Sequence, residues 1–387
     1  MALPLSYNLR SLTARWQVTL FSVFGVALAV TVLVVLTAMA SGFRIALRST
    51  GRTDNAIVLQ RGMSSELMSD ISIENAAVIA VDPGIARGAD GQALASPEIL
   101  SLISLPRSNE RAEVNVAIRG VTPRAFEVRG GLRLVEGRRF AADVAEVIVG
   151  ARARDRFGLG LGSKLTIRRS SWQVVGVFAS EGSGFESEIW GDLHTLAGPL
   201  RRTRDYQAIV LRLADPRSLP DLIGRIESDR RLQVQVKQER RFYEEQAGGV
   251  VLALTGLAVL VALIMGLGSA LAAMNTMYAM VAVRTREVGT LRALGFSRWA
   301  IVFCFASESV TLAVVGGLVG CALALPANGL TSATYGANYS ELAFAFRTTP
   351  PALGVGLLFA ALVGILGGLL PALRAARLPI ASALREV

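Results

Sequence analysis

The sequence is poor in the residue types that build metal sites and disulfides. Its 387 residues include two cysteines and one histidine, His194. One histidine excludes a histidine-rich metal site within the chain. The cysteines, Cys304 and Cys321, lie 17 positions apart in a single apolar run. On a helix this spacing corresponds to about 25 Å at about 1.5 Å per residue, too far for a disulfide, so we expect both to be packing residues.

Motifs for nucleotide hydrolysis and for hydrolytic catalysis are also missing. The nearest approach to a phosphate loop, Gly158–Lys164, has its lysine displaced from the required position. No serine-hydrolase elbow and no zinc-peptidase motif occurs. Carboxylates between 42 and 245 are scattered, and the sequence alone does not pair them. We therefore predict no catalytic residue, no metal ligand and no cofactor-binding residue in this chain.

Basic residues exceed acidic ones, but not in a pattern that suits nucleic acid. The formal net charge is +10, yet residues 42–245 carry 30 Lys and Arg against 26 Asp and Glu, without a basic block. The remaining excess lies in the short flanks of apolar runs, where positive charge sets membrane topology. We therefore exclude a nucleic-acid partner.

Four apolar runs are each long enough to cross a bilayer, which takes about 20 residues. The first is longer than the apolar part of a signal peptide, about 7–15 residues, so we expect an uncleaved anchor. The runs divide the chain into nine parts. In order, they are an N-terminal segment (1–15), the first span (16–41), a large insert (42–246), the second span (247–283), a charged segment (284–299), the third span (300–325), an external loop (326–350), the fourth span (351–373) and a tail (374–387).

If the four helices alternate in direction, the arginines that flank these runs fall almost entirely on one side of the membrane. The external loop offers one, Arg347, whereas the opposite side has nine. This bias predicts that both termini and the charged segment are cytoplasmic and that the insert faces outward. The nine are Arg10, Arg15, Arg284, Arg286, Arg292, Arg298, Arg374, Arg377 and Arg385.

The insert is predicted to be a large α+β domain between the first two spans, built either as one domain or as two subdomains. Its composition and length allow a core of its own. Helical patterns occur at Ser65–Val78 and Leu219–Ser228. Alternating or β-branched runs predict strands at Ala112–Ile118, Glu146–Val149, Lys164–Ile167, Trp172–Phe178 and Ala208–Leu213.

The segment Arg284–Arg298 carries five charges in fifteen residues between two apolar runs. Lipid does not host such a cluster, so it must lie at the membrane surface. An apolar stripe formed by Val288, Leu291 and Leu294 predicts a short interfacial helix that ends at Gly295. Its charges either dock a partner or only anchor the topology. The candidate docking residues are Arg284, Arg286, Glu287, Leu291, Arg292, Leu294 and Gly295.

Small residues and one charge stand out within the spans. Gly316 and Gly320, like Gly364 and Gly368, share a helix face, which permits close helix packing, although glycine is also simply common in membrane helices. Glu308 is costly in lipid and should make a structural polar contact inside the protein rather than relay protons.

Several motifs together resemble the FtsX-like, or MacB-type, permease family of ABC transporters. They are Met274–Met277, the run Arg284–Phe296, Glu308-Ser309, Gly316–Gly320 and the C-terminal stretch Leu370–Arg385. Weaker similarities in the insert are Arg119-Gly-Val, Glu136-Gly-Arg138 and Trp172–Phe178. The resemblance covers nearly the whole chain.

This resemblance implies a type VII permease in the bacterial inner (plasma) membrane with its large domain in the periplasm. It implies a dimer with an identical or different second permease, served by cytosolic ATPases that bind ATP and magnesium. The chain departs from the macrolide-exporter type by lacking a fused ATPase domain, so we expect a non-catalytic subunit. A periplasmic adaptor and membrane lipids are further expected partners.

The expected task is mechanotransmission for export or extraction of an amphiphile, namely a lipid, lipoprotein, peptide or drug. The alternative is a non-transporting signal transmitter that activates a periplasmic partner such as a cell-wall hydrolase. A scaffold without an ATPase is a weaker third reading.

Overall fold

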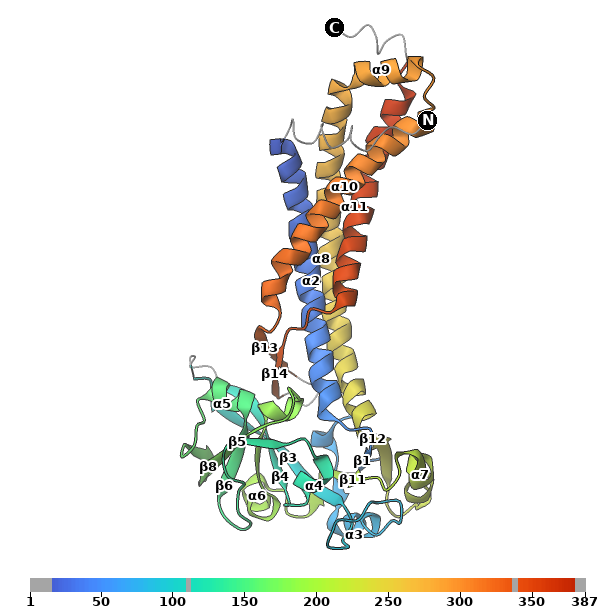
Figure 1. Cartoon of the computed structure of the whole chain (residues 1–387). Coiled ribbons are helices and arrows are strands. Elements are labelled where there is room, and N and C mark those ends of the chain that lie inside the picture. The colour runs from blue at the N-terminus through green and yellow to red at the C-terminus, as the bar shows by residue number, and fades with distance from the viewer. Residues whose placement is uncertain (1–15, 109–112, 336–339, 380–387) are drawn as a thin grey trace. The chain divides into compact units, whose positions relative to one another are not determined.

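The computed structural model describes residues 16–108, 113–335 and 340–379 (Figure 1). Three arginines of the orientation prediction, Arg10, Arg15 and Arg385, lie outside the described residues. The chain divides into two units. A helical unit comprises the chain up to Ser41, Leu252–Leu330 and the chain from Phe346, and an α+β unit comprises Gly42–Val251 with Thr331–Ala345.

Among the described residues, four helices are long and apolar enough to cross a membrane, and they lie side by side in the helical unit (Figure 1). Small and branched apolar side chains fill the space between them, for example Val30, Ala313 and Ala360. The helices are α2 (Trp16–Thr50), α8 (Glu239–Val283), α10 (Arg298–Ala324) and α11 (Pro350–Arg377), with α9 (Thr285–Ala293) and η4 (Leu325–Ala327) as connections.

Two helices extend beyond the spans expected from hydropathy. Helix α2 continues past 41 to Thr50, and α8 begins at Glu239 rather than at 247. The apolar signal ends where the sequence becomes polar, but the helical backbone goes on because the extension packs inside the α+β unit. Phe43 is fully buried there, and its ring lies 5.4 Å from that of Phe344.

The α+β unit is built on one large mixed sheet, so the predicted fold class, four membrane helices plus a large α+β domain between the first two, is confirmed. Ten strands take part, in the order β12-β1-β11-β3-β4-β9-β6-β8-β5, with β7 beside β8. The pairs β4–β9 and β6–β8 are parallel and the others antiparallel. The strands are β1 (Asn55–Gln60), β3 (Ala95–Pro106), β4 (Glu113–Val121), β5 (Arg133–Gly137), β6 (Glu146–Gly150), β7 (Lys164–Ile167), β8 (Ser170–Ala179), β9 (Ile189–Asp192), β11 (Ala208–Arg212) and β12 (Val234–Gln238).

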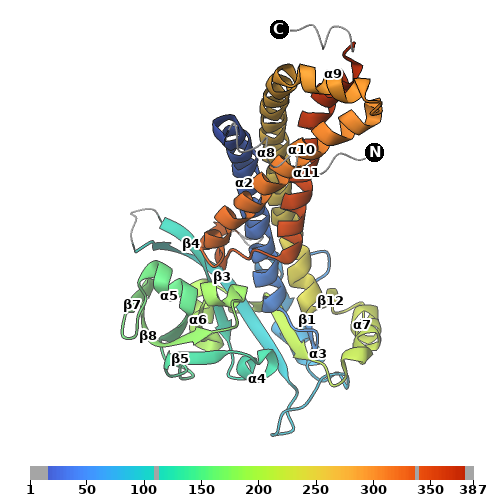
Figure 2. The same cartoon turned by 45° about the horizontal axis from the view of Figure 1, so that its top comes forward.

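Short helices cover the sheet in two groups, which Figure 2 shows at opposite ends of the unit. One core joins β3, β4, β6 and β8 to α6, and a second joins β1, β11 and β12 to α3 and α7. The remaining elements are η1 (Glu66–Met68), β2 (Ile71–Ser72), α3 (Ile73–Ile79), α4 (Ala125–Arg129), α5 (Ala151–Phe157), η2 (Gly184–Ser187), α6 (Leu193–Leu200), β10 (Asp205–Tyr206), η3 (Pro216–Ser218) and α7 (Leu219–Ser228).

Two local predictions need correction. The helix expected over Ser65–Val78 is wrong in its first half, where η1 and β2 precede α3, because Ser72 accepts a hydrogen bond from the Asn75 N–H and starts the helix there. The external loop 326–350 contains a hairpin, β13 (Thr331–Tyr335) and β14 (Glu341–Ala345), that belongs to the α+β unit.

The β13–β14 hairpin is fastened to the α+β unit through both side chains and backbone. Arg107 and Arg156 both donate to Oε1 of the buried Glu341. The backbone of Ala343 accepts from Arg152 Nη1 at 2.8 Å and donates to Ser187 Oγ at 3.0 Å. The two strands are only five residues each, and their partners are distant in the sequence, so these contacts were not predictable from it.

Candidate functional site

The segment between the second and third spans forms helix α9, which lies across the ends of α8 and α10 (Figures 1 and 2). Val288 is 2% exposed and packs with Met277, Ile301 and Phe305, and Leu291 is half-buried beside them. This apolar face holds the short helix against the helical unit, as an interfacial helix requires.

Leu294, the third residue of the predicted apolar stripe, does not lie on the buried face of α9. Leu294 is 72% exposed, because the helix ends at Ala293 and Leu294 is its C-cap. Gly295 follows with a φ of +93°, a conformation that favours glycine and turns the chain away from the helix. Leu294 is therefore presented on the surface and not to the core.

Arg284, at the start of α9, points into the helical unit. Its Nη1 lies 3.1 Å from Oε2 of Glu308, whose side chain is fully buried on α10. A weaker contact of 3.5 Å joins its Nε to Glu287 of the next turn. Glu308 thus has a structural ion-pair partner, which is how a buried carboxylate is tolerated.

Arg292, near the other end of α9, also serves as an anchor. Its Nη1 donates to the backbone oxygen of Ala376 at 2.7 Å, in the last turn of α11. A cation at a helix C-terminus satisfies an orphan carbonyl and complements the helix dipole. The sequence placed Arg284 and Arg292 among docking residues, but their side chains are turned inward and connect α9 to α10 and α11.

The outward face of α9 is left to a different set of side chains. Arg286, Glu287 and Leu294 are exposed, and so is Trp299 at the start of α10. Charged groups beside a large apolar one are typical of a surface that binds a protein. The predicted docking set therefore separates into an exposed face, Arg286, Glu287, Leu294 and Gly295, and an anchoring face, Arg284, Leu291 and Arg292.

The four glycines singled out from the sequence, Gly316, Gly320, Gly364 and Gly368, sit at close helix crossings. A Cβ added at Gly316 or Gly320 would lie 2.8 or 2.5 Å from a backbone oxygen of α2. Added at Gly364 or Gly368, it would lie 2.7 or 2.5 Å from a side chain of α10. Such contacts bring backbones close enough for polar bonds, as from Thr31 Oγ1 to the Gly320 oxygen at 3.1 Å.

Replacing Gly320 with leucine is expected to force α2 and α10 apart. The new side chain meets the Ala27 oxygen and Val30, so we expect a loss of about 1–3 kcal/mol and a lower yield of folded protein. Gly354→Leu on α11 is the matched control, since no atom lies within 4 Å of its added Cβ. Thermal unfolding in detergent measures both, and equal melting temperatures would contradict the packing role.

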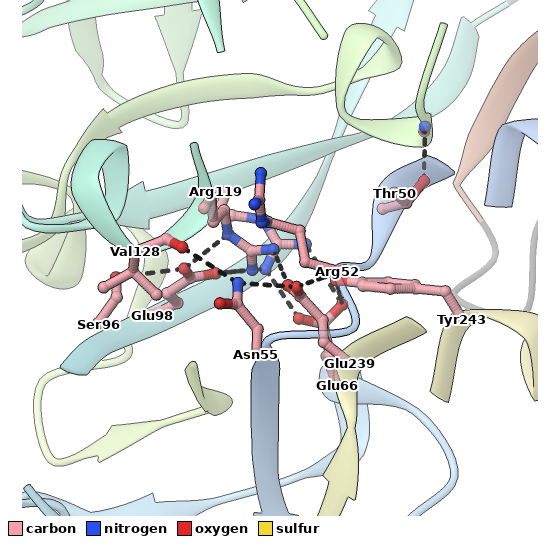
Figure 3. A network of polar contacts seen from close by, with 12 residues as sticks. Thr50, Arg52, Asn55, Glu66, Ser96, Glu98, Arg119, Val128, Glu239 and Tyr243 are labelled. Atoms are coloured by element: carbon pink, nitrogen blue, oxygen red, sulfur yellow. Dashed lines mark hydrogen bonds and ion pairs between the residues drawn. The ribbon is translucent and has the colours of Figure 1, made fainter. Parts of the chain in front are cut away.

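A second polar site, which the sequence did not reveal, lies inside the α+β unit (Figure 3). Its centre is Arg119 of β4, 1% exposed. This guanidinium binds three carboxylates at 2.8 Å: Glu66, Glu98 and Glu188. Arg119 was noted only as part of a weak motif, and no sequence signal indicated that it is buried.

Arg129, the last residue of α4, extends the same cluster. It binds Glu98 with two hydrogen bonds, of 3.0 and 2.7 Å, and its guanidinium lies over the ring of Phe185. Burial raises the pKa of Glu98, but Arg129 and Arg119 lower it by more, so its pKa lies below the ordinary value. The cluster therefore holds charged groups inside the protein by pairing carboxylates with guanidiniums.

Comparison with known proteins agrees with this architecture. The profile described as MacB-like periplasmic core domain matches residues 19–229, and that described as FtsX-like permease C-terminal matches residues 259–380. The periplasmic region of MacB from Actinobacillus actinomycetemcomitans, a solved structure, aligns with 51% of this chain and 94% of its own, at 15% identity and a TM-score of 0.39.

Full-length relatives are exporters with both ATP-binding and permease parts. The macrolide export ATP-binding/permease protein MacB of Chromobacterium violaceum is 28% identical over 298 residues, which cover 71% of this chain and 44% of the relative. The pyoverdine export ATP-binding/permease protein PvdT of Pseudomonas entomophila is 29% identical over 262 residues, 63% of this chain and 38% of the relative. The chain spans about half the length of the curated relatives it matches. Because the MacB-like profile alone covers more than half of its residues, the chain belongs to the FtsX-like, MacB-type family of ABC transporter permeases.

Proposed function

We propose that this chain is the membrane subunit of an ABC exporter in which a separate cytosolic ATPase binds the exposed face of α9 and moves the α+β unit. The observation that carries the proposal is the two-sided construction of α9. One side offers Arg286, Glu287 and Leu294 to a partner. The other side is fixed by Arg284 to α10 and by Arg292 to α11.

This construction suits the transmission of force. A buried ion pair resists separation, because pulling it apart leaves an uncompensated charge. Displacement of α9 by a partner would therefore reach α10 through Glu308 and α11 through Ala376. Helix α8, which precedes α9, is a single helix of 45 residues, about 68 Å at about 1.5 Å per residue.

In this proposal ATP is hydrolysed by the separate ATPase and not by this chain. The chain has no phosphate loop, so ATP and magnesium would be bound by the ATPase and this subunit would be non-catalytic. A second permease, identical or different, a periplasmic adaptor and membrane lipids complete the assembly. The positive flanks support an inner-membrane orientation with α9 in the cytoplasm and the α+β unit in the periplasm.

The cargo we propose is an amphiphile, such as a lipid, lipoprotein, peptide or drug. Two relatives are named for the export of a macrolide and of pyoverdine. An apolar groove of about 410 Å³ between α8 and α11, lined by residues such as Leu267 and Phe359, supports contact with an apolar part of the cargo.

Reversing two exposed charges of α9 tests the docking surface. The double variant Arg286→Glu/Glu287→Arg keeps the net charge and replaces no residue of the Arg284–Glu308 or Arg292–Ala376 contacts, although it removes the 3.5 Å contact between Arg284 and Glu287. We expect at least a tenfold loss of ATPase copurification and of stimulated ATP hydrolysis, with unchanged membrane insertion. The measurement is affinity purification of the full chain from its native membrane, followed by an ATPase assay in nanodiscs.

The control is Arg133→Glu, an exposed arginine of β5 in the α+β unit, for which we expect no change. Normal copurification of an ATPase with the α9 double variant would refute docking at this face. If a soluble cell-wall hydrolase stimulates ATP hydrolysis and no amphiphile does, the signalling hypothesis is favoured over export.

A further inference from the structure

The end of α2 and the beginning of α8 meet at a single point inside the α+β unit. Glu239, the first residue of α8, is fully buried. Its Oε2 accepts hydrogen bonds from the Arg52 N–H, just beyond α2, and from Asn55 Nδ2 on β1, both at 3.0 Å. Its Oε1 accepts from Arg129 Nη1. One carboxylate therefore connects both helices to the sheet.

The backbones also touch at this point. A Cβ on Gly51, the residue after α2, would lie 2.6 Å from Cα of Arg240 and from the carbonyl carbon of Glu239. The Arg240 N–H donates to the Arg52 oxygen at 3.2 Å. Only glycine permits this approach, so the chain leaving α2 and the chain entering α8 are packed without an intervening side chain.

A second turn of α8 adds a parallel connection. Tyr243, 3% exposed, places its hydroxyl 3.3 Å from Oε2 of Glu66. Glu66 is bound by Arg119, and Arg119 by Glu98 of β3. The first two turns of α8 thus reach the central strands through two guanidiniums, each held by more than one carboxylate.

We propose that Glu239 and Gly51 form a clamp that makes the outer ends of α2 and α8 one mechanical element, whose displacement Arg129 passes to β3. The inference rests on the proposed function, because it names the residues through which helix movement reaches the α+β unit. Partial separation of these groups leaves a buried charge without its partner, so the clamp resists gradual displacement.

Glu239→Gln tests the clamp with almost no change of volume. The amide keeps the shape but removes the charge that binds Arg129. In the wild-type complex with its ATPase in nanodiscs, we expect ATP to change the fluorescence of Trp190. This residue is fully buried, its Nε1 donates to Glu188, and its ring lies 5.9 Å from the Arg129 guanidinium. In the variant, that change should fall at least fivefold while ATP hydrolysis and ATPase copurification persist.

The fluorescence of Trp190 is isolated by replacing the other three tryptophans, Trp16, Trp172 and Trp299, with phenylalanine. Trp172→Phe removes no hydrogen bond, because the buried Nε1 has no partner among the described residues. It does remove volume from the core, so the melting temperature of this background is measured first. Gly51→Ala is the second variant, which separates the backbones without touching a charge, and it should give the same loss. Glu244→Gln is the matched control: this exposed carboxylate pairs with Arg48 across the same two helices, and a surface pair contributes little.

A crosslink tests the clamp independently of folding in the charge variants. Arg48→Cys/Glu244→Cys, joined by a short bis-maleimide, fixes α2 to α8 beside the clamp. If the two ends move as one, hydrolysis and the Trp190 response stay within twofold of the uncrosslinked protein. Arrest by the crosslink, or a full Trp190 response in Glu239→Gln, would overturn the clamp while leaving the proposed function standing. If no ATPase copurifies with the wild-type chain, or if ATP does not change the fluorescence of Trp190 in the wild type, both the proposed function and the clamp are contradicted.

Discussion

Arg119→Met should produce the largest loss of stability available to a single substitution in the α+β unit. The variant removes one guanidinium from among Glu66, Glu98 and Glu188 and leaves these carboxylates, of which Glu66 and Glu98 are fully buried, without that partner. Breaking a buried ion pair by removing one partner costs roughly 3–5 kcal/mol. We expect an early thermal transition in tryptophan fluorescence, which reports the α+β unit through Trp172 and Trp190.

The pH dependence of this loss follows from Glu98. In the wild type its pKa is lowered, so its contribution to stability is complete at neutral pH and disappears as the pH falls through the folded-state pKa. Without Arg119, one of the two groups that lower this pKa is gone and the pKa moves up. The deficit of the variant should therefore shrink as the pH falls from about 7 toward 5.

Arg231→Met is the control for Arg119→Met. This arginine is 81% exposed and pairs with Asp229 at the surface, where a salt bridge contributes at most about 1 kcal/mol. We expect a shift of a few degrees at most. An Arg119 variant that melts with the wild type at neutral pH would show that the buried cluster does not hold the α+β unit together.

The membrane helices were predictable because the signal for a span is local. About 20 consecutive apolar residues are enough to identify one, and α10 and α11 start within two residues of the expected positions. Their extensions were not predictable in the same way. Whether α2 continues to Thr50 depends on what buries Phe43, and its partner Phe344 is distant in sequence.

The functional residues show the same difference between local signals, which the sequence reveals, and long-range contacts, which it does not. The charged segment at 284–298 was found from its contrast with the flanking apolar runs. The roles of its residues were not predictable, because Arg284 and Arg292 are anchored by Glu308 and Ala376, which lie 24 and 84 residues further along the chain. The cluster around Arg119 was invisible for the same reason: its members come from η1, β3, β4 and the end of η2, and each one alone reads as an ordinary surface charge.

Glu308→Leu should disable coupling more than any exposed change on α9. The substitution leaves the Arg284 guanidinium, 14% exposed, facing an apolar helix surface. We expect α9 to separate from α10 at a cost of about 3 kcal/mol or more, with at least a tenfold loss of stimulated ATP hydrolysis. Detergent-solubilised chain is used for the melting temperature, and the complex in nanodiscs for hydrolysis.

The double variant Arg284→Met/Glu308→Leu distinguishes two roles of this ion pair, the transmission of force and the attachment of α9 to α10. Replacing both charges with apolar groups of similar size is often neutral for stability, because no charge is left unpaired. We therefore expect the double variant to recover most of the melting temperature lost in Glu308→Leu, with a coupling energy of about 1–3 kcal/mol from the mutant cycle. If hydrolysis stays low while stability returns, the ion pair itself transmits force from α9 to α10. If hydrolysis recovers with stability, the pair only holds α9 in place, and transmission depends on the packing of Val288 against α10.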